Sequence, residues 1–171
     1  MELKLPNCVV RTWHPGDAAA LVRHANNRDI WRNMRDRFPH PYTATDAENW
    51  LQFVAAHPQE SHYAIVVADE AVGGIGLIPG QDIDRRSAEI GYWLGEGYWG
   101  RGIVTEAVRA LTDYAFANTD LCRVWANVFA WNPGSMRVLE KAGFAREGVL
   151  RQAATKDGQT IDLVLFARIR A

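Results

Sequence analysis

Four glycines stand close together near the middle of the chain, at positions Gly95, Gly97, Gly100 and Gly102. They follow an alternating apolar stretch that is typical of a strand, and they precede a helical pattern that begins near Gly102. The first backbone N–H groups of a helix lack intrahelical partners, and the helix dipole makes that end positive. The turn is therefore a candidate binding site for a phosphate group.

The most obvious motif in this turn is GxGxxG, from Gly95 to Gly100. A dinucleotide-binding turn also needs an acidic residue roughly 20 residues further on, at the end of the next strand. Asp120 has this spacing but precedes the strand that we expect from Arg123. Three strands are also expected before the turn, whereas a Rossmann unit places it after its first strand. A nucleotide-dependent oxidoreductase is therefore the less favoured alternative, and a P-loop is excluded because no GK is followed by Ser or Thr.

Two polar residues flank the turn at positions where they could act chemically. Glu89 alternates with Ala88 and Ile90 along the preceding strand, so it faces the opposite side from them. A partly desolvated carboxylate there could act as a general base, and a surface pair with Arg85 or Arg86 is the alternative. Ser135 follows the sequence Asn-Pro-Gly at the start of a later helix, where a small polar residue also serves as a cap.

Periodicity and turn signals predict one domain over residues 1–171, with an α/β or α+β fold. The expected strands are Cys8–Thr12, His62–Ala68, Ala71–Ile78, Ser87–Leu94 and Arg123–Phe129, with a terminal hairpin from Ala145–Gln152 and Thr160–Arg168. The expected helices are Asp17–Ala25, Asp29–Met34, Thr43–Ala56, Gly102–Asn118 and Asn132–Ala142. The long helix joins the fourth and fifth strands, which should therefore be parallel, and a ligand should bind where they end.

Composition excludes several classes of protein. The formal net charge of −1 gives no broad positive field, so we expect no direct nucleic-acid partner. Cys8 and Cys122 lie far apart and outside any metal-binding spacing, which favours a reduced, cytoplasmic setting and no metal site. The first twenty residues lack the pattern of a signal peptide, and the apolar runs are too short to cross a membrane. The sequence leaves open whether the chain is a monomer or a homodimer.

The stretch AEIGYWLGEGYWGRGIVTEAV, followed by NPGSMRVLEKAGF, resembles the GNAT family of acetyl-CoA-dependent N-acetyltransferases, and in detail its RimJ/RimL branch. The opening segments VVRTWHPGDAAAL and RFPHPYTATDAENWL are similar to the start of that branch, so the resemblance covers nearly the whole chain. It implies the GNAT fold, with a mixed, mostly antiparallel sheet of six to seven strands, helices on both faces, and strands four and five parallel and splayed. Trp99 and Val104 depart from the family's pyrophosphate motif, so cofactor binding should depend mainly on backbone donors.

The resemblance also implies how the residues share the chemistry. Glu89 would act through water as the general base, and Ser135 would protonate the coenzyme A thiolate. Backbone N–H groups of strand four would bind the thioester carbonyl. The residues that the resemblance assigns to acetyl-CoA are Tyr92, Trp93, Leu94, Gly100, Arg101, Gly102, Ile103, Val104, Thr105, Asn132 and Ser135. Asn132 is equally a candidate N-cap of its helix.

The acceptor should lie between the segments Trp31–Tyr42 and Pro79–Arg86, which mix arginine, aspartate and aromatic residues. The candidate substrate contacts are Arg32, Phe38, His40 and Tyr42. We expect direct acetyl transfer, within a ternary complex, to a primary amine, either a protein N-terminal α-amine or a small-molecule amine. A GNAT module that binds acyl-CoA without catalysis is the main alternative.

Overall fold

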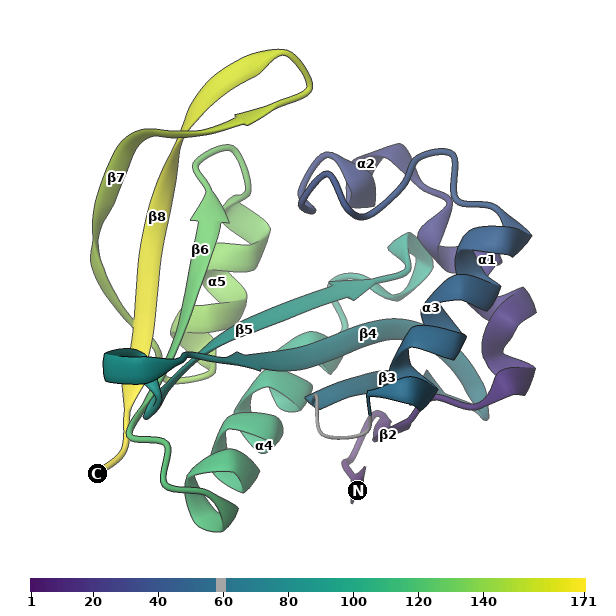
Figure 1. Cartoon of the computed structure of the whole chain (residues 1–171), viewed down its shortest axis with the longest axis horizontal. Coiled ribbons are helices and arrows are strands. Elements are labelled where there is room, and N and C mark those ends of the chain that lie inside the picture. Colours follow the sequence, from purple (N-terminus) through teal and green to yellow (C-terminus); the bar gives the residue numbers. More distant parts are fainter. Residues whose placement is uncertain (58–60) are drawn as a thin grey trace.

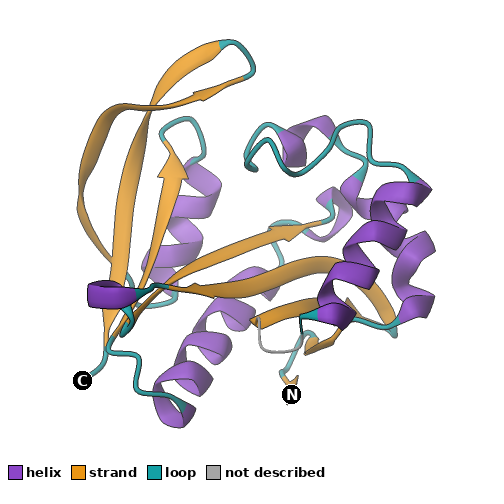
Figure 2. Ribbon diagram, viewed as in Figure 1, coloured by secondary structure: helices purple, strands orange, loops and turns teal. Residues whose placement is uncertain are grey.

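The computed structural model describes residues 1–57 and 61–171, which form a twisted sheet with helices on both faces (Figures 1 and 2). In the described residues the sheet has eight strands in the order β1-β2-β3-β4-β5-β6-β8-β7. The strands are β1 (Glu2–Lys4), β2 (Val9–Thr12), β3 (Ser61–Val67), β4 (Glu70–Pro79), β5 (Ser87–Leu94), β6 (Arg123–Phe129), β7 (Ala145–Lys156) and β8 (Gln159–Ile169). The α-helices are α1 (Ala18–Ala25), α2 (Arg28–Trp31), α3 (Ala44–Ala56), α4 (Ile103–Asn118) and α5 (Pro133–Lys141).

Strands β5 and β6 form the parallel pair of the sheet, joined by α4 as the sequence predicts. Their register contains three residue pairs, of which Glu89 opposite Trp125 is the last. Beyond this point the two strands diverge, and Figure 1 shows β6 rising toward α5 while β5 continues beside β4. The splay that the family resemblance implies is therefore present, and it opens the sheet immediately after Glu89.

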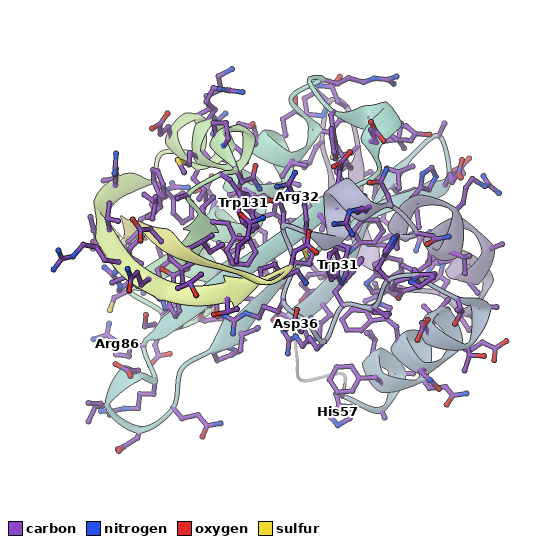
Figure 3. The ribbon with its side chains drawn as sticks, turned by 90° about the horizontal axis from the view of Figure 1, so that it is seen from above. Trp31, Arg32, Asp36, His57, Arg86 and Trp131 are labelled. Atoms are coloured by element: carbon purple, nitrogen blue, oxygen red, sulfur yellow. The ribbon has the colours of Figure 1, made fainter. Side chains whose placement is uncertain are left out.

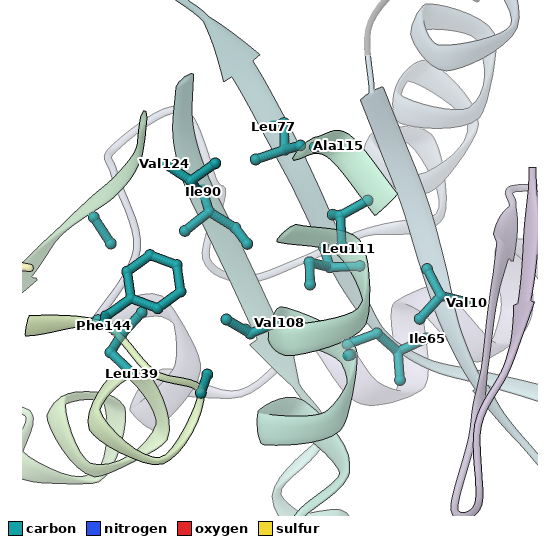
Figure 4. Close-up of a cluster of buried hydrophobic side chains, with 14 of the residues drawn as sticks. Val10, Ile65, Leu77, Ile90, Val108, Leu111, Ala115, Val124, Leu139 and Phe144 are labelled. Carbon is teal, nitrogen blue, oxygen red and sulfur yellow. The ribbon is translucent and has the colours of Figure 1, made fainter. Parts of the chain in front are cut away.

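The two faces of the sheet carry different helices. Helices α4 and α5 pack on one face, where the spacing of Ala107, Val108 and Leu111 points one side of α4 into the core. Figure 4 shows this cluster, in which Phe144 and Leu139 extend the core toward α5. Helices α1 and α3 cover the opposite face. In residues 1–57 and 61–171, no helix combines the length and apolar character needed to span a membrane.

The seven strands predicted from the sequence are one fewer than the eight of the described sheet. The missed strand, β1, has three residues with the pattern polar, apolar, polar, which is too short to predict a strand. It forms because Leu3 pairs opposite Val10 of β2 and packs against the core, which is a tertiary effect. The second helix is also shorter than predicted and ends at Trp31, while the terminal hairpin is longer than predicted in both strands.

The Asp17 carboxylate stabilises the turn that precedes α1. It lies in a short 3-10 turn and accepts hydrogen bonds from the backbone N–H of His14 and from both terminal nitrogens of Arg11, at 2.8 and 2.9 Å. Both side chains of the ion pair are largely buried. Burial alone would raise the pKa of Asp17, but the bonds from Arg11 and His14 outweigh burial and hold the pKa below its ordinary value.

Replacing this carboxylate should destabilise the fold. Asp17→Asn leaves the Arg11 charge buried without its partner, and we expect a loss of roughly 3 kcal/mol in the free energy of unfolding at pH 7. Because the folded pKa is depressed, the difference should be constant above the unfolded pKa of about 4 and should shrink as the pH falls below it. Urea unfolding at several pH values measures both effects. Lys4→Gln, at an exposed ion pair with Glu2, is the control and should change stability by less than ~1 kcal/mol.

Candidate functional site

A cleft of about 2000 Å³ lies where β5 and β6 separate. Its walls include the glycine turn, the C-terminal half of β5, the end of β6, the start of α5 and the segment that follows α2. The sequence-predicted residues Glu89, Tyr92, Gly102 and Ser135 all line it. The fold therefore brings together residues that are far apart in the chain, at the position where the splayed strands predict a ligand.

The glycine turn presents unobstructed backbone at the start of α4. Gly100 and Gly102 have φ angles of +76° and +79°, in the left-handed region that favours glycine. A Cβ atom built at either position would meet nothing within 4 Å, so the backbone angle and not crowding requires glycine. Gly102 is the N-cap of α4 and provides no side-chain acceptor for the first N–H groups. These donors and the positive end of a long helix suit a diphosphate group.

Some of the remaining residues around the turn line the cleft, and others do not. Val104 and Thr105 line the cleft, and the Trp99 indole N–H donates to the Leu94 carbonyl at 2.7 Å, which fixes the turn to the end of β5. The Arg101 guanidinium lies 5.2 Å from the centre of the Tyr98 ring and is not part of the cleft lining, although the sequence placed it at the cofactor. Two cations of α5 also line the cleft and were not singled out from the sequence, Arg137 and Lys141.

The left-handed N-cap can be tested by adding a methyl group. Gly102→Ala should lower the free energy of unfolding by about 1–2 kcal/mol, because an L-residue is strained at this φ angle. Gly97→Ala is the matched control in the same turn, since its Cβ also meets nothing within 4 Å and its φ angle is outside the left-handed region. It should leave stability unchanged or raise it by up to ~1 kcal/mol. Equal effects in urea unfolding would contradict the backbone argument.

Ser135 lies in the first turn of α5 and is hydrogen-bonded to a strand residue. Its hydroxyl lies 2.8 Å from the Tyr92 hydroxyl. Burial raises the pKa of Tyr92, and the bond to Ser135 opposes that rise in part, so Tyr92 is protonated at neutral pH. From the sequence, Tyr92 was expected to contribute only its backbone. A pair of hydroxyl groups, not a single serine, therefore faces the cleft on the α5 side.

Asn132 is the N-cap of α5. Its side-chain oxygen accepts the Ser135 backbone N–H at 3.1 Å, which is the capping geometry predicted for it. The cap fixes the first turn of α5 and with it the backbone that carries the Ser135 hydroxyl. A contact between Asn132 and the cofactor stays a prediction.

Glu89 forms an ion pair, but with a residue that the sequence did not suggest. Both carboxylate oxygens accept hydrogen bonds from Arg35, at 2.5 and 2.7 Å. Arg85 and Arg86, the partners considered from the sequence, instead contact the backbone carbonyls of Asp82 and Asp120. The Glu89 side chain is 18% exposed and Arg35 is 62% exposed. Arg35 therefore covers the carboxylate from the solvent side and can leave it without a change in the core.

Glu89 and Ser135 lie on opposite faces of β5. Successive side chains of a strand alternate in direction, so Glu89 shares its face with Trp93, which packs in the α1 and α3 cluster. Tyr92 points to the other face, where it contacts Ser135 of α5 and the larger core. A molecule that passes through the splay between β5 and β6 can therefore contact the carboxylate on one side and the hydroxyl pair on the other.

The four predicted acceptor contacts have different environments. Phe38 and Tyr42 pack together at 5.3 Å between ring centres, and burial raises the pKa of Tyr42. Both line the cleft as parts of its apolar wall. His40 packs on Trp31 at 5.8 Å and is not part of the cleft lining. The Arg32 guanidinium lies over the Trp131 ring at 5.0 Å and faces the cleft.

The tip of the β7–β8 hairpin reaches the segment around α2 and closes this side of the cleft. The Lys156 ammonium lies 3.9 Å from the centre of the Trp31 ring and 2.8 Å from Asp36, and its side chain is 2% exposed. Beside it, Asp157 accepts a hydrogen bond from Arg28 at 2.6 Å. Figure 1 shows the hairpin tip facing α2 across the top of the molecule, and Figure 3 shows Trp31 and Asp36 near the hairpin. These contacts join residues more than 100 positions apart and were not predicted.

Known proteins resemble this chain in sequence and in fold. A family model described as an acetyltransferase (GNAT) domain matches residues 7–145, which include the glycine turn, Glu89 and Ser135. The uncharacterized N-acetyltransferase p20 of Bacillus licheniformis is 31% identical over 159 residues, 90% of this chain and 88% of that protein. The ribosomal-protein-serine acetyltransferase of Escherichia coli (strain K12) is 35% identical over 107 residues, 63% of this chain and 59% of that enzyme.

Solved structures give the same result for the fold. The ribosomal L7/L12 alpha-N-protein acetyltransferase RimL, in complex with coenzyme A, superposes with a TM-score of 0.88 at 22% identity, over 99% of this chain and 98% of that chain. This likeness confirms the predicted GNAT arrangement of a mostly antiparallel sheet with one splayed parallel pair. Since the family model spans most of the sequence and contains the glycine turn with both flanking residues, the chain belongs to the GNAT acetyltransferase family and resembles its RimJ/RimL members.

Proposed function

We propose that the chain transfers the acetyl group of acetyl-CoA to a primary amine, by direct attack within a ternary complex. One observation carries this proposal. The splay between β5 and β6 begins immediately after Glu89, and it places a carboxylate and a hydroxyl pair on opposite faces of the same opening. A base on one side and a proton donor on the other side are what amine acylation requires.

The residues around the turn fit a coenzyme A molecule. Free N–H groups at the start of α4, with Gly100 and Gly102 in left-handed conformations, would hold the diphosphate. The edge of β5 from Tyr92 to Leu94 carries no strand pairing with β6 in the described residues, so its backbone donors are available to a carbonyl. When bound, acetyl-CoA supplies an activated thioester.

Side chains of the protein then accept and donate the protons of the reaction. Glu89 receives the proton that the amine loses, directly or through water. Ser135 donates a proton on the opposite face, and Tyr92, which is protonated at neutral pH, can return one to the Ser135 oxygen. Tyr92 is thus a positioning residue in this proposal.

We propose a protein N-terminal α-amine or a small-molecule amine as the acceptor. The ribosomal-protein substrates named for the Escherichia coli relative and for RimL support the first choice. The free thiols of Cys8 and Cys122 favour a cytoplasmic location, where thiols stay reduced.

Release of free coenzyme A thiol, measured with acetyl-CoA and a panel of N-terminal peptides, polyamines and aminoglycosides, tests the proposal. We expect thiol release that depends on the amine, with a mass increase of one acetyl group on the acceptor. Coenzyme A binding without thiol release across the panel would identify a non-catalytic acyl-CoA-binding module. Tight NADH binding without acetyl-CoA binding would overturn the assignment in favour of a nucleotide-dependent oxidoreductase.

A further inference from the structure

The acceptor side of the cleft contains a guanidinium without an anionic partner. Arg32 is half-buried, lies over the Trp131 ring at 5.0 Å, and forms no ion pair with any described residue. Its Nε atom is buried and has no hydrogen-bond acceptor within the described residues. The Trp131 ring is itself fixed, because its indole N–H donates to Asn33 at 3.0 Å. The guanidinium therefore packs against a fixed ring in the wall of the cleft, and Figure 3 shows Arg32 beside Trp131.

The charges near Arg32 do not neutralise it. Arg35 is paired with Glu89, and Lys156 is paired with Asp36, so four of the charges in this wall cancel. Asp29 and Arg37, the remaining unpaired charges of the lining between residues 28 and 38, are exposed to solvent and opposite in sign. An unpaired, half-buried guanidinium costs desolvation energy that a bound anion would offset.

A second polar group on the same side also lacks a partner. Asn127 lines the cleft, and its buried side-chain oxygen has no hydrogen-bond donor among the described residues. Asn127 is two residues beyond Trp125, the residue paired with Glu89, and faces the same side of β6. Asn127 is therefore the next residue on this face of β6 beyond the point where the two strands separate, on the same face of the sheet as Glu89.

We propose that these two residues select the acceptor: Asn127 accepts a hydrogen bond from the amine, and Arg32 binds a carboxylate or phosphate carried by the same molecule. The inference rests on the proposed acetyl transfer and names the acceptor class, which is an acidic amine compound and not a polyamine. Because both residues line the same cleft, an N-terminal peptide would carry the acidic group near its N-terminus.

The test compares matched tripeptide amides with Ala first and with Asp, Asn, Lys or phosphoserine at the second or third position. For the wild-type protein we expect kcat/KM to be roughly 10- to 100-fold higher for the Asp peptide than for its Asn counterpart. Arg32→Gln should abolish this preference, and Arg32→Glu should reverse it toward the Lys peptide. The KM for acetyl-CoA should stay unchanged. Arg151→Gln, at an exposed arginine of β7 outside the cleft, should keep the wild-type preference.

Asn127→Ala separates binding of the amine, proposed for Asn127, from binding of the anion, proposed for Arg32. It should lower kcat/KM for the Asp and Asn peptides by the same factor, because both carry the amine. A higher rate for phosphoserine than for Asp would identify phosphate as the preferred anion.

Several results would overturn the proposal. They are equal rates for the Asp and Asn peptides in the wild type, a preference that survives Arg32→Gln, or a raised KM for acetyl-CoA in that variant with the preference intact. Dissociation constants of the same peptides, measured with coenzyme A present, test the preference without turnover. Failure of the acidic preference leaves acetylation of neutral amines intact, whereas failure of the proposed function abolishes thiol release with every amine.

Discussion

Glu89→Gln is expected to lower kcat by roughly 100- to 10,000-fold at pH values below the optimum, since a positioned general base contributes about this much. The loss should be smaller at high pH, where an α-amine with a pKa near 8 is already neutral without help from the protein. The glutamine preserves the shape of the side chain and removes the basic group. Pre-steady-state and steady-state rates of thiol release, measured across pH, give the result. An unchanged pH–rate profile would remove Glu89 from the mechanism.

The Arg35 pair supplies the control for this experiment. Arg35→Gln breaks the same ion pair but leaves the carboxylate in place. Because Arg35 is mostly exposed, we expect a change of less than about tenfold in kcat and little change in stability. If Arg35→Gln lowered kcat as much as Glu89→Gln, the ion pair itself and not the base would be the functional unit.

The sequence predicted elements whose signals are local. The helix predicted over Gly102–Asn118 corresponds to α4, and the helix predicted over Asn132–Ala142, with Asn132 as its N-cap, corresponds to α5. The parallel pairing of β5 and β6 followed from the helix between them. Strand β1 was missed because its stability comes from pairing with β2 and from packing, neither of which leaves a pattern in three residues.

In the site, too, residues within local sequence patterns could be predicted, whereas their contact partners far away in the sequence could not. The glycine turn, Glu89 and Ser135 could be proposed from the sequence because each lies in a stretch with a recognisable local pattern. The partners of these residues could not be identified, because Arg35 is 54 positions from Glu89 and Tyr92 is 43 positions from Ser135. The buried Lys156 is further still from Asp36, at 120 positions, and its turn sequence predicts an exposed hairpin tip. Burial there results from the hairpin folding onto Trp31, which is a property of the assembled fold.

Ser135→Ala is the second large effect that we expect. Loss of the hydroxyl should reduce kcat on the order of 100-fold and leave the KM for acetyl-CoA nearly unchanged, because a proton donor to a leaving group acts mainly in the transition state. The Asn132 cap uses the Ser135 backbone N–H, so the variant keeps its helix start and should fold normally. If only KM rises, Ser135 is a binding residue.

Two further measurements distinguish proton donation from packing. An acetyl thioester whose thiol has a lower pKa needs less protonation on departure, so it should restore much of the rate of Ser135→Ala. Tyr92→Phe removes the hydroxyl that contacts Ser135 and keeps the ring in the core. If the two hydroxyl groups act as a unit, the double variant should be no slower than Ser135→Ala alone, since coupled groups give non-additive effects. Additive losses would show that Tyr92 acts independently of Ser135, and the hydroxyl pair would then not be a proton path.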